Sequence, residues 1–354
     1  MLVSLHAESF RNLEPLTWRP GPGRHLLLGE NGSGKTSLLE SIYVLATTRS
    51  FRTAQLRDCC RHGEKQFSLH GEVESAGARA KLVVHWSTDG RARTLNERSA
   101  TLAEHLAALP VLAWSEAEAE VLAGPPAQRR RFLDRGMVAE RPGLLAILTR
   151  YQRALQAKRE VLLRGGGDLE AWNDLLAELG AELVRARAEY LARVGEHLRA
   201  LLDAHERRFA EIELRYLPHP GEALAGAAAL RERLARATAS ERARRMPLVG
   251  PHRDDVAVLW RGADLRRVAS AGERKSLGMF LLAAQAVVLA GAGKPAVLLL
   301  DDADAELDRG ALGRVAEAFA GAQQLLATSS RPEVWAGLSG LQKWTVAAGR
   351  LGPG

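Results

Sequence analysis

Cysteine is almost absent from this chain of 354 residues, which contains only Cys59 and Cys60. Neighbouring cysteines rarely meet the geometry of a disulfide. Cysteine and histidine are nowhere spaced as in zinc sites, and no CxxC occurs. We therefore interpret both as reduced thiols of a cytoplasmic protein.

Long apolar runs are missing as well. The first residues do not combine a basic start with an apolar core, as a secretory signal would. The best candidate for a membrane span, residues 280–289, is too short and carries Gln285. Internal repeats and low-complexity segments are also lacking. We expect neither secretion nor insertion in a membrane.

The composition that remains is ordinary for a globular protein, except for its charge. Hydrophobic residues make up 46% and charged residues 26%, which is enough for a core. The length is sufficient for two compact units. A net charge of +7 favours a polyanionic partner such as nucleic acid. A basic bias that only keeps the protein soluble explains the charge equally well.

Hydrophobic periodicity predicts an α/β fold with an insertion. Residues 1–115 alternate short strands and turns, including a hairpin over 66–88, with one helix after a glycine loop. Residues 116–245 follow a helical period, with a helix stop at 164–168 that predicts an antiparallel helix hairpin. Strand patterns then return. We predict a head domain split over 1–115 and 246–354, and a helical arm over 116–245.

The stretch GENGSGKT matches the phosphate-loop pattern G-x-x-x-x-G-K-[ST], with a strand pattern before it and a helix pattern after it. Backbone N–H groups of such a loop surround phosphates, assisted by the helix N-terminus. We expect Lys35 to reach the β- and γ-phosphates of ATP and Thr36 to bind Mg²⁺. The predicted ATP-binding residues are Gly29, Glu30, Asn31, Gly32, Ser33, Gly34, Lys35 and Thr36.

An acidic pair follows the buried strand pattern AVLLL. Ligands bind at the carboxyl ends of parallel strands, so we assign Asp301 to the Mg²⁺ shell. Asp302 would then polarise the attacking water, which makes Asp302 and Lys35 the predicted catalytic residues. The separation between Lys35 and Asp301 is far longer than a nucleotide kinase or a small GTPase needs. It favours an ATPase head interrupted by an arm.

A second candidate anion site is SAGERKS, residues 270–276, which opens a long apolar helix. Ser270 offers a hydroxyl, Gly272 an unobstructed backbone, and the helix N-terminus a partial positive charge. The phosphate loop of the same chain already surrounds its own nucleotide. We therefore expect a second copy to present this segment, so that two heads arranged head to tail bury two nucleotides.

These motifs occur in an order that resembles the ABC-type ATPases of the SMC class. They are GENGSGKT, SAGERK, LLLDD and ELD. The resemblance is closest to the RecF family, on five further strings that span the chain: SFRNLEPL, RSFRT, RRRFLD, GPHRDD and DDADAELD.

This resemblance implies an ABC-type P-loop ATPase head, built as a mixed sheet with helices, and an inserted α-helical arm. It implies an ATP-dependent homodimer that binds DNA at duplexes or single/double-strand junctions and hydrolyses ATP slowly. The implied partners are RecO- and RecR-type proteins, with which it would load RecA at single-stranded gaps. Carried over by position, the signature motif acting in trans comprises Ser270, Gly272 and Glu273, while Asp308 lies in the D-loop and Thr328 at the switch position.

Three positions depart from the transporter-type pattern. Asp302 replaces a glutamate, which fits slow turnover, and Ala305 replaces the serine expected in the D-loop. No glutamine occurs at 114–116, where a glutamine loop is expected. Another SMC-like ATPase and an ABC transporter subunit are the alternatives. The transporter subunit would need a switch histidine near Thr328, and a full SMC protein would need hundreds of residues of heptads.

Arginines supply the candidate DNA contacts, which would bind phosphates without sequence preference. Ordinary solvated helix faces are the alternative, and the absence of interleaved aromatics favours duplex or junction binding over base stacking. Arg11 and Asn12 follow the first strand and are further ATP-site candidates, with a plain turn as the alternative. The DNA candidates are Arg49, Arg52, Arg129, Arg130 and Arg131.

Overall fold

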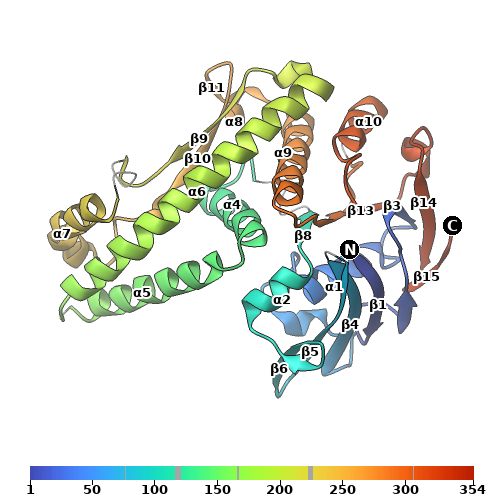
Figure 1. Cartoon of the computed structure of the whole chain (residues 1–354), viewed down its shortest axis with the longest axis horizontal. Helices are drawn as coiled ribbons and strands as arrows, with labels where there is room; N and C mark the ends of the chain where they lie inside the picture. Colours follow the sequence, from blue (N-terminus) through green and yellow to red (C-terminus); the bar gives the residue numbers. More distant parts are fainter. Residues whose placement is uncertain (76, 116–120, 166, 222–225, 306) are drawn as a thin grey trace. The chain divides into compact units, whose positions relative to one another are not determined.

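The computed structural model describes residues 1–75, 77–115, 121–165, 167–221, 226–305 and 307–354 (Figure 1). The chain forms two compact units. The first comprises Met1–Glu120, His197–Ala210 and Ala269–Gly354, and the second comprises Val121–Glu196 and Glu211–Val268.

The first unit contains an antiparallel sheet with the strand order β2-β1-β4-β5-β6-β7. Along β4, Phe67, Leu69 and Val73 are buried and alternate with polar residues, as expected when one face packs on a core. The expected hairpin is confirmed as the β4–β5 pair. The strands are β1 (Leu2–Glu8), β2 (Leu16–Trp18), β4 (Gln66–Ser75), β5 (Ala78–Ser87), β6 (Gly90–Leu95) and β7 (Arg98–Ser99).

The second sheet of this unit has the order β15-β14-β3-β13-β12-β8 and is parallel except for the β14–β15 pair. Strands β8, β12 and β13 are buried along their whole length, as parallel strands covered on both faces are. The carboxyl ends of β3 and β12 therefore point to one edge. The strands are β3 (Gly23–Leu28), β8 (Val111–Trp114), β12 (Val297–Leu300), β13 (Gln324–Ser329), β14 (Leu341–Ala347) and β15 (Arg350–Pro353).

Both sheets and helix α1 (Lys35–Thr47) share one hydrophobic core, to which α1 contributes Leu38, Leu39, Ile42 and Leu45. The fully buried Gln324 links the sheets, because its side chain exchanges hydrogen bonds of 2.8 and 2.9 Å with the backbone of Leu2.

Further helices of this unit are α2 (Leu102–Ala108), α9 (Ala271–Gly291) and α10 (Arg309–Ala318), with short 3-10 turns η1 (Leu56–Cys59), η2 (Arg207–Phe209) and η5 (Pro332–Trp335). The expectation of a single helix before residue 115 was wrong. Helix α2 begins at a capping box of Thr101 and Glu104. It was missed because a helix of seven residues is too short to show a clear hydrophobic period. Helix α9 is long and apolar enough to cross a membrane, but 72% of that window is buried inside the unit, as in a core helix.

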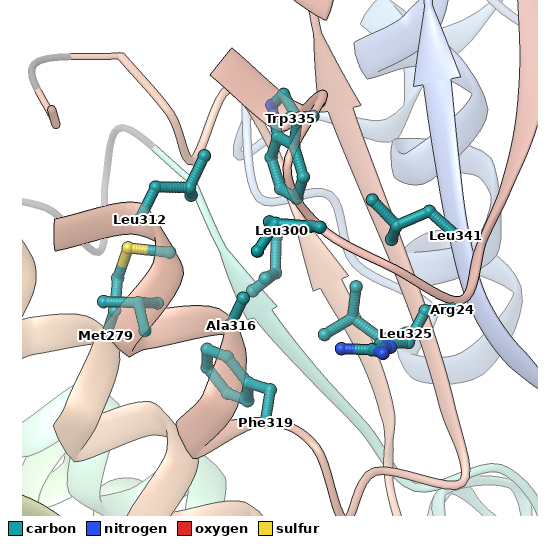
Figure 2. A pocket seen from close by; sticks show the side chains of 11 residues that line it. Arg24, Met279, Leu300, Leu312, Ala316, Phe319, Leu325, Trp335 and Leu341 are labelled. Atoms are coloured by element: carbon teal, nitrogen blue, oxygen red, sulfur yellow. The ribbon is translucent and has the colours of Figure 1, made fainter. Parts of the chain in front are cut away.

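Helices α9 and α10 close over β12 and β13 around a small apolar cavity (Figure 2). Its volume of about 10 Å³ holds at most one water, so it is a packing defect rather than a ligand site. Its lining includes Met279, Leu300, Leu312, Phe319 and Trp335.

The second unit is mostly helical, with α4 (Pro126–Glu140), α5 (Leu144–Arg164), most of α6 (Glu170–His205), α7 (Ala227–Arg244) and the short α8 (Leu265–Val268). The helix stop at 164–168 is confirmed. Gly165 ends α5 with a left-handed φ of 73°, and Asp168 accepts a hydrogen bond of 2.7 Å from the backbone N–H of Glu170.

Strand β9 (Ile212–Leu217) was missed by the sequence analysis, which took residues 116–245 as helical. It pairs antiparallel with β10 (Asp255–Trp260), where strand patterns were expected to return, and β10 continues into β11 (Ala263–Asp264) after a turn at Gly262. The 3-10 turn η4 (Pro251–Arg253) precedes β10. This pairing places residues 246–268 in the second unit, so the compact units meet near residue 268 rather than at the expected boundary of 245.

Candidate nucleotide-binding site

The phosphate-loop sequence connects β3 to α1 and forms a tight turn. Gly32 and Gly34 have left-handed φ angles of 80° and 112°, which favour glycine. Gly29 is required for space, because a Cβ there would lie 2.2 Å from the carbonyl oxygen of Val346. The loop thus leads directly into the N-terminus of α1, which starts at Lys35.

Lys35 is folded into this loop. Its side chain is almost fully buried, and its Nζ donates to the carbonyl oxygens of Gly29 (2.7 Å) and Glu30 (2.9 Å). The ammonium is therefore held inside the loop that is expected to enclose phosphates.

Asp301 follows β12 and lies beside the loop, as expected. Its Oδ1 accepts hydrogen bonds from the hydroxyls of Thr36 (2.9 Å) and Thr328 (2.8 Å). Burial raises the pKa of the Asp301 carboxyl, and the neighbouring Asp302 adds to this effect. The site therefore places a negative charge where it is poorly solvated, which a cation would offset.

The donor set fits Mg²⁺. The Thr36 hydroxyl donates a hydrogen bond to Asp301, so the lone pairs of its oxygen stay available to a cation. Among the described residues no cluster of three His, Cys, Asp or Glu side chains could hold a metal alone. One hydroxyl and one carboxylate are donors that suit a Mg²⁺ ion whose shell is completed by phosphate oxygens and water.

Arg11 and Asn12 also lie at this site. Asn12 donates through Nδ2 to the carbonyl oxygen of Gly32 (2.9 Å) and accepts from the hydroxyl of Ser37 (2.7 Å), so it braces the loop. Arg11 binds the buried carboxylate of Glu40 on α1 through two contacts of 2.7 and 2.9 Å. Both residues form a turn after β1, as the alternative expected, and both also line the cleft described next.

These side chains surround one open cleft of about 1020 Å³. Its volume is sufficient for a nucleotide. The residues that line it are Arg11, Asn12, Glu14, Asn31, Gly32, Gly34, Lys35, Thr36, Ser37, Arg52, Asp58, Cys60, Arg61, His62, Asp302 and Ala348.

Arg52, expected at a DNA surface, lines this cleft instead. Its guanidinium lies 3.3 Å from Glu40, and its positive charge partly offsets the raised pKa of Asp301. Arg49 is exposed. Sequence analysis missed Glu40, the buried carboxylate that holds both Arg11 and Arg52, because a single acid within an apolar helix has no recognisable spacing.

The segment expected to act in trans begins α9. Ser270 is exposed and caps the helix: its Oγ accepts from the N–H of Glu273 (3.3 Å), while Glu273 Oε2 accepts from the N–H of Ser270 (2.8 Å). This backbone hydrogen bond lowers the pKa of Glu273, which stays ionised. Glu273 thus serves the cap, and Ser270 and Gly272 are left as the groups suited to a phosphate.

The remaining head motifs adjoin the acidic pair. Asp308 caps α10 by accepting from the N–H of Ala311 (2.7 Å), and Ala305 is exposed. Lys275 on α9 donates to the carbonyl oxygen of Ala305 (2.6 Å). The glutamine loop was expected at residues 114–116. Trp114 is the last residue of β8, and Glu116 lies outside the described residues.

The arginine run of α4 does not form one basic face. Arg129 is buried and binds Asp255 through two contacts of 2.7 and 2.9 Å, which argues against a DNA contact. Arg130 is partly buried and donates to the carbonyl oxygen of Asp254 (2.6 Å), whereas Arg131 is exposed.

The GPHRDD string lies in the second unit, where it forms a polar network. Asp254 is fully buried and accepts from the N–H of His219 (2.7 Å) and from Arg187 (3.2 Å), as well as from the hydroxyl of Tyr216. Burial lowers the pKa of His252 to about 4, so the imidazole is neutral, and its Nδ1 shares a hydrogen bond of 2.8 Å with the hydroxyl of Tyr151. This string therefore organises the arm.

The comparison with protein families defines the class. Residues 1–348 match the family described as the RecF/RecN/SMC N terminal domain. The fold agrees, because the chain is similar to an Smc head bound to the C-winged helix domain of ScpA, with a TM-score of 0.59 over 99% of this chain and 95% of that one at 14% identity. The molecule is an ABC-like P-loop ATPase head of this class with an inserted arm.

Within that class, the chain is similar to DNA replication and repair proteins named RecF. One from Anaeromyxobacter sp. is 36% identical over 321 residues, covering 87% of this chain and 86% of the relative. One from Geobacter sulfurreducens is 34% identical over 314 residues with the same coverage. The chain belongs to the RecF family of recombination mediators.

Solved structures agree with this assignment. A structure of the recombination mediator RecF with ATP in the RecFOR pathway superposes with a TM-score of 0.88 at 26% identity, over 99% of this chain and 97% of that one. A second RecF structure, with ATPrS, has a TM-score of 0.89 at 24% identity, over 100% of this chain and 98% of that one.

Proposed function

We propose that this chain is an ATP-driven switch for DNA binding, in which ATP and Mg²⁺ bring two copies together head to tail. The observation that carries the proposal is the joint hydrogen bonding of Thr36 and Thr328 to Asp301. It unites the end of the phosphate loop, the acidic pair and the switch position at one edge of the sheet.

For ATP binding, support comes from the cleft itself. Lys35 supplies the ammonium inside the loop, and the N–H groups that begin α1 add a partial positive charge. A bound Mg²⁺ would supply positive charge to the phosphates, held by Thr36 and Asp301. Asp302 lines the same cleft and is placed to orient a water and accept its proton.

The proposed dimer rests on the exposed start of α9. The hydroxyl oxygen of Ser270 accepts the cap hydrogen bond, and its O–H can donate to a phosphate of the partner's nucleotide. Gly272 leaves the backbone open. Because two like surfaces related by a twofold axis contact each other reciprocally, each copy completes the other's site.

DNA is the proposed polyanionic partner, bound as duplex or at single/double-strand junctions. The net charge of +7 and the exposed Arg49 and Arg131 support this. We further propose that DNA stimulates the slow hydrolysis that resets the dimer, and that RecO- and RecR-type proteins assist the loading of RecA at single-stranded gaps.

The decisive experiment measures molecular mass and DNA affinity with and without ATP. We expect ATP to double the mass and to tighten DNA binding, and DNA to raise the hydrolysis rate. A protein that stays monomeric with ATP and binds DNA equally well in both states would refute the switch.

The Ser270→Arg variant tests the interface. It should bind ATP like the unmodified protein yet remain monomeric, because a bulky cation replaces the small hydroxyl. Leu163→Arg is the matched control, since it adds the same side chain at an exposed position of the second unit and should still dimerise. Ser270→Ala removes the hydroxyl, and with it both the helix cap and the proposed phosphate donor, without adding bulk. Normal dimerisation of Ser270→Arg would place Ser270 outside the interface.

A further inference from the structure

Thr328 uses both hydrogen-bonding capacities of its hydroxyl on the acidic pair. The side chain is fully buried near the end of β13. Its Oγ1 donates to Oδ1 of Asp301 (2.8 Å) and accepts from the backbone N–H of Asp302 (2.8 Å). One hydroxyl therefore connects the side chain of one aspartate to the main chain of the next.

The backbone that Thr328 holds is strained. Asp302 has a left-handed φ of 44°, a conformation that is unfavourable for a residue with a side chain and persists only where the surroundings fix it. The carbonyl oxygen of Asp302 is also fixed, because it accepts from the N–H of Ala305 (3.1 Å). These two contacts set the direction in which the Asp302 side chain leaves the chain toward the cleft.

A residue at the switch position is expected to sense the γ-phosphate by donating a hydrogen bond to it. A hydroxyl can donate only one hydrogen bond, and the Thr328 hydroxyl already donates its hydrogen bond to Asp301. Resting on the proposed function, we infer that Thr328 is a positioning residue for hydrolysis: it fixes Asp301 and Asp302 relative to each other and does not contact the nucleotide.

The first test compares Thr328→Val with Thr328→Ser in ATP hydrolysis. Valine keeps the β-branched shape and removes the hydroxyl, so kcat should fall at least about tenfold, as for the loss of a hydrogen bond to a charged group. KM should stay within about threefold, because the phosphate loop is intact. Thr328→Ser should retain the unmodified kcat.

A matched control tests whether the effect comes from the contacts of the Thr328 hydroxyl with the aspartates or only from removing a buried hydroxyl. Ser41→Ala removes another fully buried hydroxyl, which donates to the carbonyl oxygen of Leu38 (2.7 Å) and touches neither aspartate. It should leave kcat unchanged. An unaltered kcat in Thr328→Val, or an equal loss in Thr328→Ser, would overturn the inference. A raised KM with normal kcat would show direct nucleotide contact instead, which also overturns it.

The second test needs no turnover and so separates this inference from the proposed function. In nucleotide-free protein, the amide of Asp302 should exchange its hydrogen at least about tenfold faster in Thr328→Val than in Thr328→Ser. Equal exchange in the two variants would contradict the inference even if the unmodified protein hydrolysed no ATP. If Thr328→Val does not fold, Thr328→Ala replaces it in both tests.

Discussion

Gly29 has less space for a side chain than the other two glycines of the phosphate loop, Gly32 and Gly34. An added Cβ would lie 2.2 Å from the carbonyl oxygen of Val346 and 2.7 Å from Oγ of Ser33. Backbone cannot yield as a flexible side chain does, so Gly29→Ala should separate β14 from the loop. We expect it to lower stability by about 2 kcal/mol and to abolish ATP binding.

A matched glycine provides the control for this prediction. Gly313 lies in the middle of α10, and a Cβ there would meet nothing within 4 Å. Gly313→Ala should therefore raise stability by up to about 1 kcal/mol and leave ATP binding intact. Thermal melting and nucleotide titration measure both variants. A Gly29→Ala protein that melts and binds as usual would show that the loop and β14 can move apart.

How well the site could be predicted depends on how local each interaction is. Lys35 and Thr36 follow from one contiguous motif, because its spacing itself encodes the turn and helix start. Asp301 required only that it follow a buried strand. Glu40 could not be found, since its partners Arg11 and Arg52 are brought to it by the fold.

The same limit applies to secondary structure. The helix that ends at residue 164, α5, was predicted because its periodic pattern is long, and strands β3 and β12 were predicted because each is a compact apolar run next to a recognisable motif. Strand β9 was not, since its alternation of Ile212, Leu214 and Tyr216 is brief and lies between helices. Its strand state depends on pairing with β10, which is distant in the sequence.

Helix α4 allows structural arginines to be separated from DNA-binding ones. Arg129→Ala would leave Asp255 without its partner and should lower the stability of the second unit by about 3 kcal/mol. Arg131 is exposed, so Arg131→Ala should change stability by less than about 0.5 kcal/mol. If Arg131 contacts a phosphate, this variant should reduce the salt dependence of DNA binding by about one charge.

Thermal melting and DNA titrations at several salt concentrations distinguish the two roles. The structural role of Arg129 would be refuted if Arg129→Ala melted at the usual temperature but its DNA affinity depended less on salt concentration. Arg131 would be excluded as a phosphate contact if its replacement left both the affinity and the slope unchanged.

For the molecule as a whole, the proposed dimer predicts that two different defective chains repair each other. Lys35→Met removes the ammonium from a chain's own phosphate loop but leaves its α9 start intact. Ser270→Arg disrupts the start of α9 but leaves the phosphate loop of its own chain intact. Each variant alone should therefore be nearly inactive, because neither can assemble a complete site from its own copies.

A mixed dimer joins the intact phosphate loop of the Ser270→Arg chain to the intact Ser270 of the Lys35→Met chain, and so contains one complete site. Random assembly in an equimolar mixture would make half of the dimers mixed, each with one working site of two. We therefore expect recovery of up to about a quarter of the unmodified hydrolysis rate, and less where the Ser270→Arg chain associates weakly. Adding Lys35→Met to a Lys35→Met, Ser270→Arg double variant is the control, since no complete site can form. Because neither chain can supply a complete site from its own residues, recovered activity would require that Ser270 acts on the nucleotide of the partner. A mixture no more active than its separate components would argue instead that each head completes its site within one chain.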